Sequence, residues 1–255
     1  MKTRNALAAA AVVLASVVPV RAQLYTGLSG LIHVPSAEMN PEGTARIGGY
    51  FLNSRFTPDN SGPYGFTYEG RKYNTTDYYL SVAPFRWMEI GYTFTLQKSL
   101  LDGYEKPKYN QKDRYFSLKL NPLKEGRYYP AIAVGGNDIF GSPTRWHNEQ
   151  GSGAGYFCNY YIVATKHFRP WGHCIGVNVA YRYCPKVPFR KWEGVVGGVT
   201  YSPSFARHLR AIVEYTGNEI NIGADCLLWR HLFIQAAMVE GRYFTGGLCF
   251  QTNLF

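Results

Sequence analysis

WMEIGYTFTLQ, residues 87–97, alternates from Met88 onward between large apolar side chains and small or polar ones. In an extended strand one face would carry Met88, Ile90, Tyr92, Phe94 and Leu96, and the other Glu89, Gly91, Thr93, Thr95 and Gln97. The same period of two recurs in YFSLKLN (115–121) and in YFTGGLCFQTN (243–253). These stretches predict β-strands with one apolar face.

About twelve such segments follow one another along the chain, each near the roughly ten residues that a tilted membrane strand needs. They are expected around 43–53, 73–84, 86–98, 113–121, 128–137, 155–167, 173–184, 191–202, 208–217, 219–228, 230–240 and 242–254. The connections 54–72, 99–112 and 138–154 are long and rich in Gly, Pro and charge, whereas the others are turn-like. Short turns at one end and long loops at the other predict an all-β fold, a single antiparallel transmembrane β-barrel over residues 43–255.

A soluble β-sandwich is the alternative, because its strands alternate in the same way. Two features favour the barrel: the even number of expected strands with a terminal Phe255, and small polar residues where a sandwich would expose Lys and Glu.

The first 22 residues have the pattern of a cleavable export signal. Lys2 and Arg4 precede an apolar run from Ala6 to Val18, and small residues close it at Ala22. The run is shorter than the roughly 20 residues that a spanning helix requires. The next residue is Gln23 rather than Cys, so we do not expect a lipoprotein. An exported barrel is expected in the outer membrane of a Gram-negative cell envelope.

Charge and export together narrow the expected partners. Without the signal, 24 Lys and Arg remain against 17 Asp and Glu, which gives a formal charge of +7. A basic exported protein favours outer-membrane lipid, the phosphates of lipopolysaccharide or an acidic polysaccharide, and nucleic acid is not expected.

The sequence offers little for catalysis or for a cofactor. The histidines are scattered, and none has a serine at a spacing that indicates a nucleophile and its base. Neither a zinc-ligand spacing nor a phosphate-binding glycine loop occurs. The cysteines are odd in number and widely spaced, and we expect mostly small apolar fillers or a single disulfide: Cys158, Cys174, Cys184, Cys226 and Cys249. No enzyme, metal or cofactor is predicted.

Four stretches resemble motifs of the YjbH-type, exopolysaccharide-associated outer-membrane proteins. GLIHVPSAEMNPEGTARIGG (30–49) resembles a G-L-I-x-x-P-(S/T)-A-x-M-x-x-(D/E)-G pattern, and SVAPFRWMEIGYTF (81–94) looks like a P-F-x-W-x-E-x-G strand. DRYFSLKLNPLKEGRYYPAIAVGGNDIFGS (113–142) and NYYIVATKHF (159–168) resemble two further family segments. The resemblance covers residues 27–185 and implies an outer-membrane barrel linked to the secretion or assembly of extracellular polysaccharide. Family members are commonly much longer than this chain.

The segment before the first expected strand, residues 23–42, has two interpretations. A barrel of about twelve strands has a lumen too wide for small side chains to fill. An apolar segment stiffened by proline would fold inward as a plug, with Leu28, Leu31, Ile32, Val34 and Pro35 as its candidate residues. The other interpretation is an ordinary first strand or a periplasmic tail.

Seven charged residues fall on the small-residue face and are expected to point into the lumen: Asp77, Glu89, Lys119, Arg182, Arg210, Glu214 and Asp225. They would either pair across the lumen and lock it, or line a polar path. Asp113 and Asp138, near expected strand ends, and Glu149, in a long loop, are interpreted as rim residues.

Three functional classes remain at this stage: a scaffold or narrow conduit for polysaccharide, a structural subunit of another outer-membrane or periplasmic envelope complex such as secretion or barrel-assembly machinery, and a lipid-modifying barrel enzyme.

Overall fold

The computed structural model describes residues 23–55, 67–68, 71–99, 106, 108–141, 157–185 and 192–255. The predicted signal, residues 1–22, and Glu149 lie outside these ranges. Among the described residues no helix is both long enough and apolar enough to cross a membrane.

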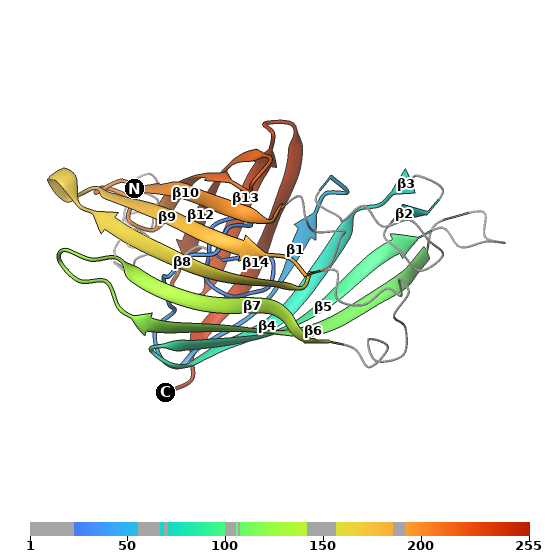
Figure 1. Ribbon diagram of the computed structural model, residues 1–255, viewed down its shortest axis with the longest axis horizontal. Coiled ribbons are helices and arrows are strands. Elements are labelled where there is room, and N and C mark those ends of the chain that lie inside the picture. Colours follow the sequence, from blue (N-terminus) through green and yellow to red (C-terminus); the bar gives the residue numbers. More distant parts are fainter. Residues whose placement is uncertain are drawn as a thin grey trace, which may run out of the picture.

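Twelve antiparallel strands close into a barrel in which each strand pairs with its neighbours in the chain and β14 returns to β1 (Figure 1). They are β1 (Thr44–Leu52), β4 (Thr75–Phe85), β5 (Met88–Ser99), β6 (Lys108–Leu123), β7 (Ala131–Gly141), β8 (Asn159–Phe168), β9 (Cys174–Tyr183), β10 (Gly194–Ser202), β11 (Leu209–Tyr215), β12 (Ile220–Leu228), β13 (Leu232–Val239) and β14 (Tyr243–Asn253). A short hairpin, β2 (Thr67–Tyr68) with β3 (Arg71–Lys72), interrupts the β1–β4 connection, and a single turn of 3-10 helix, η2 (Pro170–Gly172), joins β8 to β9.

The all-β prediction and the closed antiparallel barrel are therefore confirmed. The predicted strands overlap the observed ones, but several bounds differ, and the differences at β6 and β7 change the position of two predicted residues. Strand β6 begins at Lys108 instead of 113, and β7 continues to Gly141 instead of ending at 137. Asp113 and Asp138 consequently lie within strands and are buried, not on the rim as predicted. The alternating pattern weakens where Lys, Arg and Gly enter these strands, so the pattern ends before the hydrogen bonding does.

The two ends of the barrel differ. At one end, short connections join β4 to β5, β6 to β7, β8 to β9, β10 to β11 and β12 to β13. We call this the turn end, and it lies at the left of Figure 1. Strands β1, β5, β7, β9, β11 and β13 end at the opposite end of the barrel, which we call the loop end. The β12–β13 turn is tight because both of its central residues, Trp229 and Arg230, have positive φ (49° and 67°), the geometry that matches strand twist in a hairpin.

The barrel has its polar side inside. Polar and charged side chains that are almost fully buried point inward, including Glu89 and Lys119 of neighbouring strands. Large apolar side chains on the alternate positions are exposed, as at Leu80 (55 %) and Ile47 (61 %). This is the reverse of a water-soluble sandwich, in which the packed interior is apolar.

The five cysteines all lie in the described part of the chain, and none is bridged to another. Cys158, Cys184 and Cys249 are buried, and the other two are half-buried. Burial raises the pKa of the Cys184 thiol to about 11, which favours its protonated form at neutral pH.

Candidate functional site

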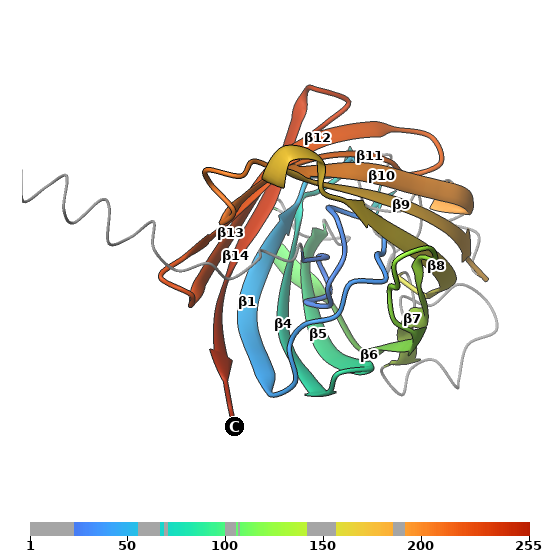
Figure 2. The same cartoon turned by 90° about the vertical axis from the view of Figure 1, so that its left-hand side faces the viewer.

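The N-terminal segment, residues 23–42, lies inside the ring of strands (Figure 2, blue). Every residue from Gln23 to Ala37 is buried. We call this segment the plug.

Short local hydrogen bonds fold the plug into compact turns. The Leu24 N–H donates to the Leu28 carbonyl at 2.8 Å, and the Leu31 N–H donates to the Val34 carbonyl at 2.8 Å. Gly27 makes the first turn with φ +83°, where a Cβ would lie 2.5 Å from the Tyr79 ring. The plug thus forms some of its backbone hydrogen bonds within itself, and it packs closely against the barrel wall.

The apolar residues predicted to form the plug are all buried between the plug and the barrel wall. Leu28, Leu31, Ile32 and Val34 are fully buried, and Pro35 is buried as well. Leu31, Ile32 and Val34 share a cluster with small and branched wall residues of β7 to β13: Ala131, Ala133, Val163, Ala180, Val196, Ile212 and Ala237. Small side chains on the wall leave the space that the plug fills.

Glu89 and Lys119 form the first polar anchor of the plug. The Glu89 carboxylate accepts hydrogen bonds from the backbone N–H groups of Ser29 (2.9 Å) and Asn40 (2.6 Å). The Lys119 Nζ lies 3.3 Å from Glu89 Oε2 and donates to the carbonyls of Ser29 (2.8 Å) and Glu38 (2.6 Å), as well as to the Ser29 hydroxyl. Both charges are buried, and each one is compensated by the other and by the plug backbone.

Glu214 forms the second anchor. Its carboxylate accepts the N–H groups of three successive plug residues, Ile32 (2.9 Å), His33 (2.9 Å) and Val34 (3.0 Å). Consecutive N–H groups that converge in this way make an anion-binding concavity. The His33 Nδ1 and the Asn221 amide also contact this carboxylate, at 3.2 and 2.9 Å, and Arg182 donates to the His33 carbonyl.

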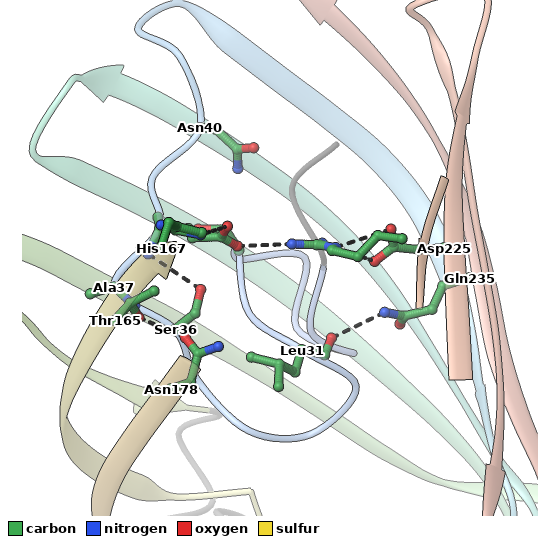
Figure 3. A network of polar contacts seen from close by, with 12 residues as sticks. Leu31, Ser36, Ala37, Asn40, Thr165, His167, Asn178, Asp225 and Gln235 are labelled. Carbon is green, nitrogen blue, oxygen red and sulfur yellow. Dashed lines mark hydrogen bonds and ion pairs between the residues drawn. The ribbon is translucent and has the colours of Figure 1, made fainter. Parts of the chain in front are cut away.

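A third anchor crosses the lumen through Glu38 of the plug (Figure 3). Arg210 donates to Asp225 Oδ2 at 2.9 Å and, from its other terminal nitrogen, to Glu38 Oε2 at 3.0 Å. The second Glu38 oxygen lies 3.0 Å from His167 Nε2, and His167 Nδ1 lies 2.6 Å from Glu125. A continuous chain of charged contacts therefore runs from β12 to the β6–β7 turn.

Glu125 closes this chain at the turn end. Burial opposes its ionisation, but hydrogen bonds from the His167 ring and backbone and from Lys166 outweigh this effect and lower the pKa of the Glu125 carboxyl. The carboxylate therefore remains charged at neutral pH and holds the turn against β8.

Neutral side chains complete the contacts around the plug. Gln235 donates to the Leu31 carbonyl at 3.1 Å, and the Thr165 hydroxyl accepts the Ala37 N–H at 2.7 Å (Figure 3). Ser81 donates to the Gly27 carbonyl at 2.8 Å. Strands from β4 to β13 thus contact the plug from all sides of the lumen.

The structure brings six of the seven predicted lumen charges to the plug or to a residue that contacts it. Asp77 is the exception. It is buried and accepts a hydrogen bond from Thr95 at 2.5 Å, without a described contact to the plug. Sequence reasoning missed Glu38, Ser29, His33 and His167. Glu38 had one usable signal, since it is the first charged residue after Gln23 in an otherwise uncharged stretch.

Within the part of the chain that the structure describes, His, Cys, Asp and Glu form no group of three or more that could hold a metal ion.

Comparison with known proteins then identifies the family. The family model YjbH, described as "Exopolysaccharide biosynthesis protein YbjH", matches residues 22–183, which include the plug and strands β1 to β9. The chain belongs to the YjbH family. The matched residues contain Ser29, Glu89 and Lys119, so the first plug anchor lies within the part of the chain that the family model matches.

One curated relative is the "Uncharacterized lipoprotein YjbH" of Escherichia coli (strain K12). It is 25 % identical over 271 aligned residues, which cover 88 % of this chain and 34 % of the relative. The chain thus spans about a third of the length of this YjbH relative.

Proposed function

We propose that this YjbH-family chain is an outer-membrane barrel closed by its own N-terminal plug, and that it serves as a non-enzymatic scaffold in the secretion or assembly of exopolysaccharide. The observation that carries the proposal is the plug itself, which fills the lumen and is held by three anchors of buried charge. The family description supports the link to exopolysaccharide.

The outer surface supports residence in a membrane. Large apolar side chains are exposed around the barrel, for example Leu80 (55 %), Val179 (55 %), Ile222 (56 %) and Leu248 (59 %). Water-soluble monomers rarely expose continuous apolar patches larger than a few hundred Å². A closed barrel also leaves no unpaired strand edge, as a lipid environment requires.

Aromatic residues gather near both ends of this apolar surface. Exposed aromatics in or beside the connections of the turn end are Trp87, Tyr128, Trp171, Phe205 and Trp229. Those near the loop end are Phe140, Tyr160, Tyr183, Tyr215 and Phe244. Two aromatic belts of this kind mark the interfaces of membrane barrels, whose short turns face the periplasm. We therefore assign the turn end to the periplasm.

The anchors favour a scaffold over a conduit. A polymer could pass through this lumen only if the plug left it, and its departure would break the hydrogen bonds that plug N–H groups donate to Glu89 and Glu214 and the ion pair between Glu38 and Arg210. Glu89 would keep Lys119 and Arg210 would keep Asp225, but each lost hydrogen bond to a charged group costs about 1.5–3 kcal/mol. The carboxylates of the anchors already accept hydrogen bonds from the plug, which supports a non-enzymatic role.

A disulfide that locks the plug separates the two possibilities. A Cβ on Gly91 would lie 3.6 Å from Leu28 Cγ, close to where the Sγ of a cysteine at position 28 would sit. The variant Leu28→Cys/Gly91→Cys should therefore form a plug-to-wall disulfide in an oxidising periplasm. The two single variants serve as controls for the loss of packing.

Cells that lack the native gene should recover the same amount of surface polysaccharide from the locked protein as from the two single variants. Thiol alkylation before and after reduction measures how much protein is locked. If polysaccharide returned only after reduction of the disulfide, the plug would have to move and the scaffold would be refuted in favour of a conduit.

A further inference from the structure

A cavity of about 880 Å³ opens at the turn end, between the end of the plug and the turns of the barrel. The plug contributes Glu38 and Glu42, and the β6–β7, β8–β9 and β10–β11 connections contribute Lys124, Arg169 and Arg207. Its volume lies in the upper part of the 300–1,000 Å³ range of ligand pockets, so it has room for several linked chemical groups.

The acidic residues of this cavity are already paired. Glu42 lies 3.0 Å from Arg86, Glu125 lies 3.1 Å from Lys166, and Glu38 lies 3.0 Å from both Arg210 and His167. Each of these carboxylates therefore contributes little net negative charge to the cavity.

Three basic residues of the cavity differ from these carboxylates in their surroundings. Lys124, Arg169 and Arg207 are exposed, and no acidic side chain among the described residues lies within salt-bridge distance of them. Together they give the mouth of the cavity a surplus of positive charge.

The contacts of Glu38 show that the inner wall of the cavity can bind a carboxylate. Its two carboxylate oxygens are held by different groups, one by Arg210 and the other by His167. Arg210 is itself fixed by Asp225 at 2.9 Å, so its guanidinium is oriented before any ligand arrives. The inner wall thus already binds one carboxylate, and the outer wall offers two further guanidinium groups suited to the same planar anion.

We propose that this cavity binds the carboxylate-bearing sugars of an acidic polysaccharide, with Arg169 and Arg207 at its mouth as the contacts that select them. The proposal rests on the proposed function for its periplasmic orientation and its link to exopolysaccharide. The cavity chemistry adds the substrate class: an acidic glycan is retained and a neutral one is not.

Binding is measured with the purified protein in nanodiscs of zwitterionic lipid, using fluorescent tetragalacturonic acid as the probe. Maltotetraose, a neutral oligosaccharide of the same length, is the comparison probe. The site variant is Arg169→Gln/Arg207→Gln. The control variant is Arg127→Gln/Arg230→Gln, which removes two exposed arginines of the same end that do not line the cavity.

The site variant should bind tetragalacturonic acid at least tenfold more weakly, the control variant within twofold of the natural protein, and maltotetraose should not bind. Added salt should weaken the binding of the acidic probe, because salt screens the interaction between exposed charges. Equal losses in both variants would overturn the proposal, since only the overall positive field would then matter. Equal affinity for maltotetraose, or no binding of the acidic probe, would overturn it as well.

Purified lipopolysaccharide, added as a competitor, separates a sugar site from a lipid headgroup site. Weaker displacement by lipopolysaccharide than by unlabelled tetragalacturonic acid supports the glycan, and the reverse order overturns the proposal. These measurements need no movement of the plug and no secretion. Failure of the disulfide test with intact binding would therefore refute the scaffold alone, whereas lost binding with a functional locked plug would refute this site alone.

Discussion

Replacing Lys119 with methionine tests how strongly buried charge holds the plug. The Lys119 Nζ lies 3.3 Å from Glu89 Oε2 and also donates to the Ser29 and Glu38 carbonyls, and neither charged side chain is more than 2 % exposed. Methionine has a similar length, so the change removes the charge and its donors with little change in volume. Breaking one side of a buried pair should lower the free energy of unfolding by about 3–5 kcal/mol.

The matched control is an exposed ion pair of the same barrel. Arg86 Nε lies 3.0 Å from Glu42 Oε2, but the two side chains are 74 % and 38 % exposed. Arg86→Met should therefore cost only about 0–1 kcal/mol. Urea titrations of the protein folded into lipid vesicles, followed by tryptophan fluorescence and extrapolated linearly to water, measure both values.

The double variant Glu89→Gln/Lys119→Met completes a thermodynamic cycle. Once Lys119 is gone, loss of the Glu89 charge should relieve part of the penalty, which gives a coupling of about 0.5–3 kcal/mol. The reasoning is refuted if Lys119→Met costs no more than Arg86→Met, or if the two single changes are simply additive.

Three further changes test other parts of the account by the same unfolding measurement. Leu80→Arg, on the outer face in the middle of β4, should cost about 2–4 kcal/mol in lipid and Phe85→Arg, at the strand end, about 0–1, so equal costs would contradict the membrane orientation. Hydrogen bonds from β8 outweigh burial and lower the pKa of Glu125 in the folded protein. The charge of Glu125 therefore stabilises the fold fully at a pH above the pKa of the unfolded chain, about 4.3. This stabilisation is lost as the pH falls through the lower pKa of the folded protein. The stability difference between the natural protein and Glu125→Gln should therefore shrink below pH 4, and a constant difference from pH 7 to pH 3 would exclude this role. Gly27 and Gly241 both have positive φ, but only at Gly27 would a Cβ meet an aromatic ring, at 2.5 Å. Gly27→Ala should thus cost about 1–3 kcal/mol more than Gly241→Ala, and equal costs would show that the plug does not pack closely against β4.

The period of two was sufficient to predict the strands, because it reports directly which residues of a strand share a face, and the even number of expected strands favoured a barrel over a sandwich. It placed Glu89, Lys119 and Glu214 on the inner face. It does not report which residues meet across the lumen. The contact between Glu214 and His33 joins positions 181 residues apart, and that between Glu38 and His167 joins positions 129 apart.

The plug shows a second limit of the sequence. Its apolar residues left two interpretations open, an inward plug on the one hand and a first strand or a tail on the other, because residues 23–42 have no sustained period. What decides between them is the surface that they meet: small wall residues such as Ala133 and Ala180 leave space, and carboxylates of the wall receive the backbone N–H groups of the plug. Those features come from strands far along the chain and act together only after the barrel has closed.

Electrical conductance tests the central claim, a barrel closed by its own N-terminal segment, most directly. The natural protein and a variant lacking residues 24–38 are each inserted into planar lipid bilayers, and single-molecule currents are recorded. The account predicts that the natural protein inserts without a steady current, whereas the shortened variant gives stepwise, long-lived openings, because the strands begin only at Thr44. A steady conductance of the natural protein as large as that of the variant would contradict the account.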